Sequence, residues 1–104
     1  MDTRSNWVCG NHHHKVSVNV NFKKCIVIND DLDAQAVLVV QNKASVAVTI
    51  EGETFTNFGG NEDCAVSTLN PGFTRGCFGP TRHLGGTGPM AEVRLNLNTV
   101  DDWL

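Results

Sequence analysis

The sequence predicts an all-β protein, a small β-sandwich or β-barrel of about seven to eight short antiparallel strands that disulfides hold together. Three observations lead to this class. Short runs of alternating apolar and polar residues recur along the chain. Turn-forming residues separate these runs. Four cysteines occur without the close C-x2-C pairs of a zinc site. With 104 residues, the chain is expected to form one domain, residues 1–104.

Three segments alternate with a period of two, which is typical of half-buried strands. Residues 36–40 are apolar on both faces, as in a central strand covered from both sides, and residues 25–28 form another short apolar run. The side chains expected to face the core are Val16, Val18, Val20 and Phe22 in residues 15–22, Val46, Val48 and Ile50 in residues 45–50, and Val93, Leu95 and Leu97 in residues 92–97.

Turn residues divide these segments. Residues 29–31 (Asn-Asp-Asp) are expected to close one strand, and residues 41–43 (Gln-Asn-Lys) to form a tight hairpin turn. The glycine-rich residues 83–89 are expected to form a loop. Thr99 is followed three residues later by Asp102, a spacing that resembles a capping box and predicts a short helical turn at the end of the chain.

The cysteines are Cys9, Cys25, Cys64 and Cys77, and four cysteines allow three disulfide connectivities. An even number of cysteines in a short, glycine-rich chain favours disulfides over a metal site or free thiols. We favour the pairs Cys9–Cys25 and Cys64–Cys77, because each pair flanks one candidate hairpin. Such disulfides are typical of secreted proteins, so we expect the protein to be secreted.

Charge and apolar content limit the classes of partner that we expect. The formal net charge is −3, and no basic run exceeds Lys23–Lys24, so nucleic acid is not an expected partner. The longest apolar run, residues 36–40, is far shorter than the roughly 20 residues of a membrane span. The first residues lack the apolar stretch of a signal peptide, so a secreted form would begin at a mature terminus.

Histidines and acids are the candidates for metal binding or catalysis. His12, His13 and His14 are interpreted as part of a solvated loop, because further ligands at defined spacing are missing, and no metal or cofactor is expected. Glu92 with Asp101 or Asp102 is the best candidate for the carboxylate pair of a glycoside hydrolase. The simpler interpretation, an exposed strand residue and a cap, is favoured over an enzyme.

Aromatic residues next to asparagines suggest a different kind of site. Phe55 and Phe58 lie close in sequence to Asn57 and Asn61. An apolar floor with a few polar groups is the general composition of a ligand pocket and would suit a sugar. Asn57 and Phe58 are therefore candidate ligand-binding residues, although core packing is the favoured interpretation for any single aromatic ring.

Several segments, read in order, resemble thaumatin-like proteins. Residues 18–25 (VNVNFKKC), 72–78 (GFTRGCF) and 85–96 (GGTGPMAEVRLN) are similar to segments of that family, and residues 100–104 (VDDWL) follow in the family's order. The resemblance implies a β-sandwich or barrel with a cleft that carries Arg75, Glu92 and Asp102. It also implies roles in defence, antifungal action and β-glucan binding.

Residues 22–25 (FKKC) resemble residues 73–77 (FTRGC), which is a faint internal duplication. This duplication and the spacing of Cys9, Cys25, Cys64 and Cys77 are similar to those of cyanovirin-like lectins. That family has a comparable length and two local cysteine pairs. Both resemblances imply a secreted protein that binds cell-wall glycans in defence or host–microbe contact. The alternatives are a small secreted effector, inhibitor or toxin that binds another protein, and a weak glycan hydrolase.

Overall fold

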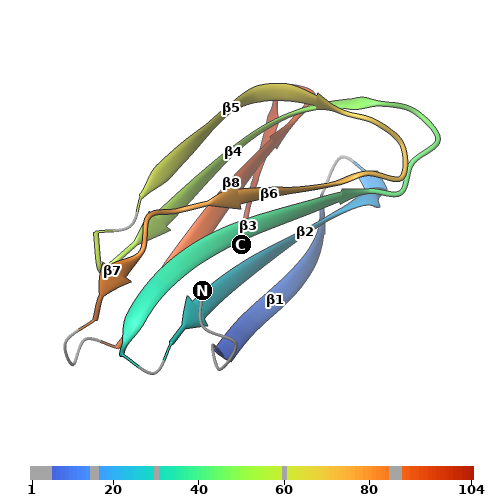
Figure 1. The fold of residues 1–104 in the computed structure, drawn as a ribbon. Coiled ribbons are helices and arrows are strands. Elements are labelled where there is room, and N and C mark those ends of the chain that lie inside the picture. Colours follow the sequence, from blue (N-terminus) through green and yellow to red (C-terminus); the bar gives the residue numbers. More distant parts are fainter. Residues whose placement is uncertain (1–5, 15–16, 30, 60, 85–87) are drawn as a thin grey trace.

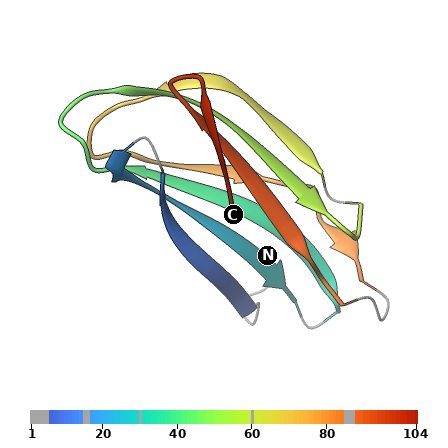
Figure 2. The ribbon, with the colours of Figure 1, turned by 180° about the vertical axis from the view of Figure 1, so that it is seen from behind.

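The computed structural model describes residues 6–14, 17–29, 31–59, 61–84 and 88–104, with the backbone alone at residues 6–8, 11–13 and 17–18. Within these ranges the chain forms nine strands, arranged as two antiparallel sheets, and no helix. No helix in these ranges is therefore long and apolar enough to cross a membrane. The sheets lie as two layers in Figure 1 and, from behind, in Figure 2, which confirms the all-β class as a sandwich.

The first sheet has the strand order β1-β2-β3-β6, and the short strand β7 pairs with β3 beyond the end of β6. The second sheet has the order β5-β4-β8-β9. The strands of the first sheet are β1 (Asn6–His14), β2 (Ser17–Ile28), β3 (Asp33–Asn42), β6 (Thr74–Phe78) and β7 (Arg82–His83). Those of the second sheet are β4 (Val48–Thr56), β5 (Glu62–Leu69), β8 (Ala91–Leu97) and β9 (Val100–Trp103).

Period-two patterning decides which side of each strand enters the core. Alternation in β2 buries Val20 and Phe22, as predicted, whereas the side chains of Val16 and Val18 lie outside the described residues. The predicted run at residues 25–28 is the end of this same strand. In β8 the prediction is confirmed in full, because every second residue is buried and the others face outward. Those buried residues are Val93, Leu95 and Leu97.

The core lies between the two sheets, and central strand β3 is buried on both of its faces, as predicted. Its side chains Leu38 and Val40 enter the main core, whereas Val37 joins a small cluster with Cys25 and Val27 on the outer face of the first sheet. Each fully buried Leu, Val or Phe side chain contributes roughly 1.5–3 kcal/mol through the hydrophobic effect. The main core contains Val20, Phe22, Leu38, Val40, Val48, Ile50, Leu69, Cys77, Val93, Leu95 and Leu97.

Two predictions about the middle of the chain are wrong. Residues 41–43 form no hairpin turn, because β3 continues to Asn42 and the next strand, β4, belongs to the other sheet. Val46 does not face the core, since β4 begins only at Val48 and Val46 is 63% exposed in the connecting loop. In both cases local patterning missed a crossover between the sheets, which depends on long-range packing.

The expected helical turn at the end of the chain is also wrong. Asn98 and Thr99 have φ values of 48° and 75° and form the two-residue turn of a β-hairpin between β8 and β9. Positive φ at both central residues is the geometry of a tight hairpin turn. The turn places Trp103 directly opposite Arg94. Strand pairing with β8 therefore outweighs the capping-box signal of Thr99.

The disulfides are Cys9–Cys25 and Cys64–Cys77, which confirms the predicted pairing. Only the first closes a hairpin, that of β1 and β2. Cys64–Cys77 instead joins β5 of the second sheet to β6 of the first. The sheets approach closely beside it, because a Cβ atom on Gly52 would lie 2.6 Å from the Leu38 side chain. A larger residue at position 52 would therefore require the buried Leu38 side chain to move.

Asn42, a buried residue at the end of β3, connects the loops at this end of the sandwich. Its side-chain amide donates hydrogen bonds to the carbonyl oxygens of Val46 and Leu69, and its Oδ1 accepts one from the amide of Ala44. Its backbone pairs with Phe73 and Gly72. Because buried backbone groups need partners, this one side chain satisfies three positions where the chain crosses between sheets.

We expect Asn42→Ala to lower the free energy of unfolding by about 3 kcal/mol, since it removes the partners of two carbonyl groups and one amide. Urea denaturation followed by circular dichroism measures the change. Asn70→Ala, at an exposed position, is the matched control and should cost less than about 0.5 kcal/mol. Equal effects of the two substitutions would contradict this role of Asn42.

Removing the disulfide between the sheets, in the variant Cys64→Ala/Cys77→Ala, is expected to cost about 3 kcal/mol, because the closed loop has a sequence separation of 13. Urea denaturation under non-reducing conditions measures the midpoint of the variant, which is compared with that of the wild type. An unchanged midpoint would show that the sandwich holds without this cross-link.

Candidate functional site

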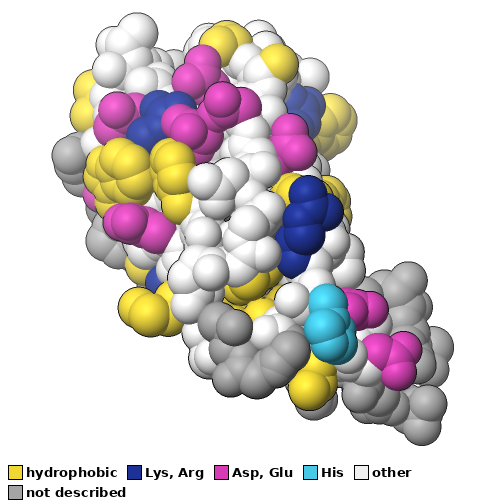
Figure 3. Space-filling view, turned by 90° about the vertical axis from the view of Figure 1, so that its left-hand side faces the viewer, with side chains coloured by type: hydrophobic (Ala, Val, Ile, Leu, Met, Phe, Trp, Pro, Cys, Tyr) yellow, Lys and Arg dark blue, Asp and Glu magenta, His cyan; other side chains and the backbone are white. Residues whose placement is uncertain are grey.

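The outer face of the second sheet carries a mixture of charged and aromatic side chains. On each of its inner strands, residues that alternate with the buried ones point away from the core. Figure 3 shows acidic side chains gathered around a basic one, with hydrophobic side chains beside them. The outward residues are Glu51, Glu53 and Phe55 on β4, Glu92, Arg94 and Asn96 on β8, and Asp101 and Trp103 on β9.

Two aromatic rings form a platform on this face. Phe55 of β4 and Trp103 of β9 stack with ring centroids 5.6 Å apart and an interplanar angle of 29°. Strand β8 lies between them, with Glu92 opposite Phe55 and Arg94 opposite Trp103. Trp103 remains 48% exposed. We call this pair the Phe55–Trp103 platform.

A groove of about 550 Å³ adjoins the platform where β4 ends and β8 begins. It has an apolar part, which Phe55 provides, and polar groups at its margin. Since Phe55 belongs to both the groove and the platform, the two features form one surface. Lys24, Phe55, Asn57, Met90, Glu92 and Leu104 are among the residues that line the groove.

Asn57 shapes the wall of this groove. Its Nδ2 donates a hydrogen bond to the carbonyl oxygen of Gly88 at 2.9 Å, and its Oδ1 accepts one from the amide of Met90 at 2.8 Å. Its backbone amide donates to the Met90 carbonyl oxygen. A carboxamide has two N–H donors and two acceptor lone pairs, so one of each remains for a ligand.

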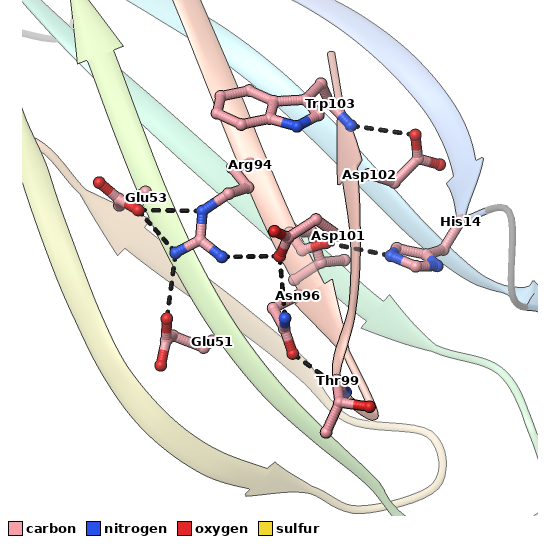
Figure 4. Close-up of polar contacts among 10 residues, drawn as sticks. His14, Glu51, Glu53, Arg94, Asn96, Thr99, Asp101, Asp102 and Trp103 are labelled. Carbon is pink, nitrogen blue, oxygen red and sulfur yellow. Dashed lines mark hydrogen bonds and ion pairs between the residues drawn. The ribbon is translucent and has the colours of Figure 1, made fainter.

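Arg94 is the centre of the charged group on this face (Figure 4). Its Nε and Nη2 donate to Glu53 at 2.9 and 2.6 Å, Nη2 also donates to Glu51 at 3.0 Å, and Nη1 donates to Asp101 at 2.7 Å. The Arg94 side chain is 13% exposed. Burial lowers its pKa, but the hydrogen bonds to Glu51, Asp101 and Glu53 outweigh burial and raise the pKa of Arg94 above its ordinary value.

These contacts extend to the hairpin that carries Trp103. Asp101 also accepts a hydrogen bond from Asn96 at 2.8 Å, and the Asn96 Oδ1 accepts one from the Thr99 amide at 3.1 Å. Arg94 therefore fastens β9 to β8 and β4 through side chains as well as through the backbone. Since Trp103 lies two residues beyond Asp101, this group fixes the position of the platform.

The histidine run is not a solvated loop. It lies at the end of strand β1, and His14 is 1% exposed. The His14 Nε2 lies 3.0 Å from the carbonyl oxygen of Leu95, and its ring packs against Phe22 with centroids 5.9 Å apart. The side chains of His12 and His13 lie outside the described residues.

His83, the fourth histidine of the chain, lies elsewhere in the fold. Its Nδ1 contacts Asp33 at 3.0 Å where β7 pairs with β3. Among the described side chains, no three His, Cys, Asp or Glu residues come together as a group that could hold a metal ion.

The residues of the predicted cleft occupy separate places. Arg75 contacts the Ser67 hydroxyl and the Thr68 carbonyl oxygen across the β5–β6 side of the sandwich. Glu92 points outward into the groove, whereas Asp102 is paired with buried Leu95. Figure 4 shows Asp101 and Asp102 pointing to opposite sides of β9.

Of the predicted binding residues, Glu92 and Asn57 therefore meet in one groove, and Arg75 and Asp102 do not join them. Phe58 is half-buried in the turn after β4. Phe55 was noted beside the candidate residues Asn57 and Phe58 but was not itself predicted to bind a ligand, and Trp103 was not predicted to do so either. Period-two alternation places Phe55 on the same strand face as Glu51 and Glu53, so its outward position could be predicted. The position of Trp103 depends on the hairpin that pairs β9 with β8.

Comparisons of the chain with protein-family models, with curated proteins and with solved structures find no match. The resemblances to thaumatin-like proteins and cyanovirin-like lectins thus stay predictions.

We expect Arg94→Ala to lower the free energy of unfolding by about 2 kcal/mol, because it removes charge-assisted hydrogen bonds and leaves three carboxylates close together. Arg94→Lys keeps the charge without the planar fork and should recover only part of the loss. Urea denaturation measures both variants. Arg82→Ala is the control, since exposed Arg82 has a hydrogen bond to the carbonyl oxygen of the adjacent Thr81. An effect of Arg94→Ala no larger than that of the control would contradict the role of Arg94.

Proposed function

We propose that this protein binds extracellular glycans, and that the Phe55–Trp103 platform with its groove is the binding site. The observation that carries the proposal is a stacked, partly exposed aromatic pair beside a groove with polar margins. One face of a sugar ring presents C–H groups, which pack against aromatic rings, while the hydroxyl groups at its edge need hydrogen bonds. The platform supplies the first kind of contact and the groove supplies the second.

Polar groups at the groove suit hydroxyl recognition. The exposed carboxylate of Glu92 can accept hydrogen bonds from two neighbouring hydroxyl groups, and Lys24 across the groove can donate to a ring or hydroxyl oxygen. Asn57 adds one donor and one acceptor. Their orientation is fixed, because the same side-chain amide also forms hydrogen bonds with the backbone of residues 88 and 90. Fixed polar groups lose little entropy on binding and thus favour specificity.

The disulfides support an extracellular location. Both pairs are formed, and such bonds persist in secreted proteins but are rare in the reducing cytosol. A secreted protein that binds cell-wall glycans would fit the roles in defence or host–microbe contact implied by the two resemblances.

A second candidate function is protein binding, as expected of an effector, inhibitor or toxin. Strand β6 lies at an edge of the first sheet, and Phe73 and Phe78, just before it and at its end, are more than half exposed. An exposed edge strand with apolar side chains is a surface that a protein partner can cover. Glycan hydrolysis receives no such support: Asp102 lies on the opposite face of the second sheet from Glu92, and Asp101, which shares the face of Glu92, is bound to Arg94 and Asn96.

We expect Trp103→Ala to weaken glycan binding by roughly 30-fold, the loss of about 2 kcal/mol that is typical of an aromatic at the centre of a binding site. A glycan array identifies the ligand, and calorimetry measures the dissociation constants. Trp103→Phe should retain part of the affinity. Phe78→Ala removes an exposed aromatic on the other sheet and should leave binding unchanged.

Circular dichroism and urea midpoints show whether each variant is folded. If no glycan on the array binds the wild-type protein, or if Phe78→Ala weakens binding as much as Trp103→Ala, the platform is not a glycan site. Loss of a protein partner in Phe78→Ala alone would then favour the second candidate function.

A further inference from the structure

We infer that the groove selects glycans by charge: amine-bearing sugar chains bind more tightly than uncharged ones, and chains with carboxylate or sulfate groups are rejected. This inference rests on the proposed glycan-binding function and adds the chemical class of the ligand. Its basis is the distribution of charge along the outer face of the second sheet.

Acidic groups outnumber basic ones on this face. The described residues of the platform, the groove and the adjoining hollow include five carboxylates and two cations, which leaves a net charge of −3. The carboxylates are those of Glu51, Glu53, Asp63, Glu92 and Asp101, and the cations are Lys24 and Arg94. A surface of one dominant sign attracts ligands of the opposite sign and repels those of the same sign.

Arg94, the more central cation, is already engaged by protein carboxylates. Four of its five N–H groups donate to Glu51, Glu53 and Asp101, and its side chain is 13% exposed. A guanidinium binds a carboxylate or sulfate ligand best through two parallel N–H groups, which Arg94 no longer offers. Among the described residues of this surface, an anionic sugar would thus meet five carboxylates with Lys24 alone to compensate for them.

The hollowed surface continues beyond the groove. A hollow of about 420 Å³, lined by Glu51, Glu53, Asp63 and Arg94, lies farther along β4. A third hollow of about 490 Å³ includes Thr49, Asn96 and Asn98. A nine-residue strand such as β4 spans roughly 30 Å, several times the length of one sugar ring. A chain of sugars that packs on the platform and runs along β4 toward Glu51 would therefore pass over the acidic hollow.

The size of the selectivity follows from Coulomb interactions at the surface. Charges about 7 Å apart in a solvent-exposed groove interact by a few tenths to about 1 kcal/mol, so a few pairs change affinity roughly tenfold. Screening by salt must reduce the effect, because the Debye length falls from about 14 Å near 0.05 M to about 4 Å near 0.5 M.

The test uses a glycan array with matched neutral, amine-bearing and uronic acid oligomers of the same linkage and length. Calorimetry in mildly acidic buffer, where sugar amines are protonated, then compares β-1,4-linked hexamers of glucosamine, glucose and glucuronate, together with the corresponding β-1,3-linked glucose and glucuronate hexamers. We expect the amine-bearing chain to bind about tenfold more tightly than the neutral chain of its series, and each uronate chain about tenfold more weakly. Both ratios should shrink toward one in about 0.5 M salt.

Two single substitutions separate local charge from net charge. Glu92→Gln removes a negative charge from the groove, and Asp31→Asn removes one from the exposed turn between β2 and β3. We expect Glu92→Gln to reduce the amine-to-uronate ratio about threefold, while Asp31→Asn leaves it unchanged. Equal effects of both variants, or uronate binding as tight as glucosamine binding, would overturn the inference.

The outcome also separates this inference from the proposed function. If uronate chains bind as well as the others and Trp103→Ala weakens their binding, the platform is a glycan site and only the charge selectivity is wrong. If no oligomer on the array binds, the proposed function fails and the inference fails with it.

Discussion

The ion pairs of Arg94 are the interaction on which the candidate site depends. One guanidinium connects carboxylates on two other strands: Glu51 and Glu53 on β4, and Asp101 on β9. Strand β9 has only four residues and lies at the edge of its sheet, so its backbone pairing alone is modest. The contact with Asp101 holds this strand in place, and Trp103 lies on it. The aromatic platform therefore depends on a charged group that takes no part in stacking.

The sandwich itself depends on a different constraint, the connection of the two sheets. Cys64–Cys77 joins the edge strands β5 and β6, and Arg75 bridges the same edges through Ser67 and Thr68. Asn42 satisfies the backbone where the chain passes between sheets at one end. On the opposite side, buried His14 contacts the carbonyl oxygen of Leu95 in the second sheet. Polar and covalent contacts thus fix the relative position of two sheets whose apolar core is small.

Sequence patterns predicted the elements with strict alternation, such as β8, and the disulfide pairs. They failed where the deciding contact is distant in sequence. Asn42 looked like a turn residue, but its partners include Leu69. The spacing of Thr99 and Asp102 resembled a helix cap, but pairing with β8 outweighed it. In the candidate site, Glu92 and Asn57 were predicted because side-chain type and sequence neighbours are enough to select them. The contact between Phe55 and Trp103 forms only after three strands pair, so the sequence does not reveal it.

The strands of the second sheet serve the core on one face and the candidate site on the other. In β4, Ile50 and Thr54 are buried while Glu51, Glu53 and Phe55 face outward. Inserting or deleting one residue in such a strand would exchange the two faces at once. Substitutions at outward positions can therefore change the recognition surface without altering the core, whereas an inserted residue in β4 or β8 would have to be absorbed by an irregularity such as the register shift between β4 and β5 at Ile50 and Gly52. The ligand specificity of the outward face can thus change while the strand register stays the same.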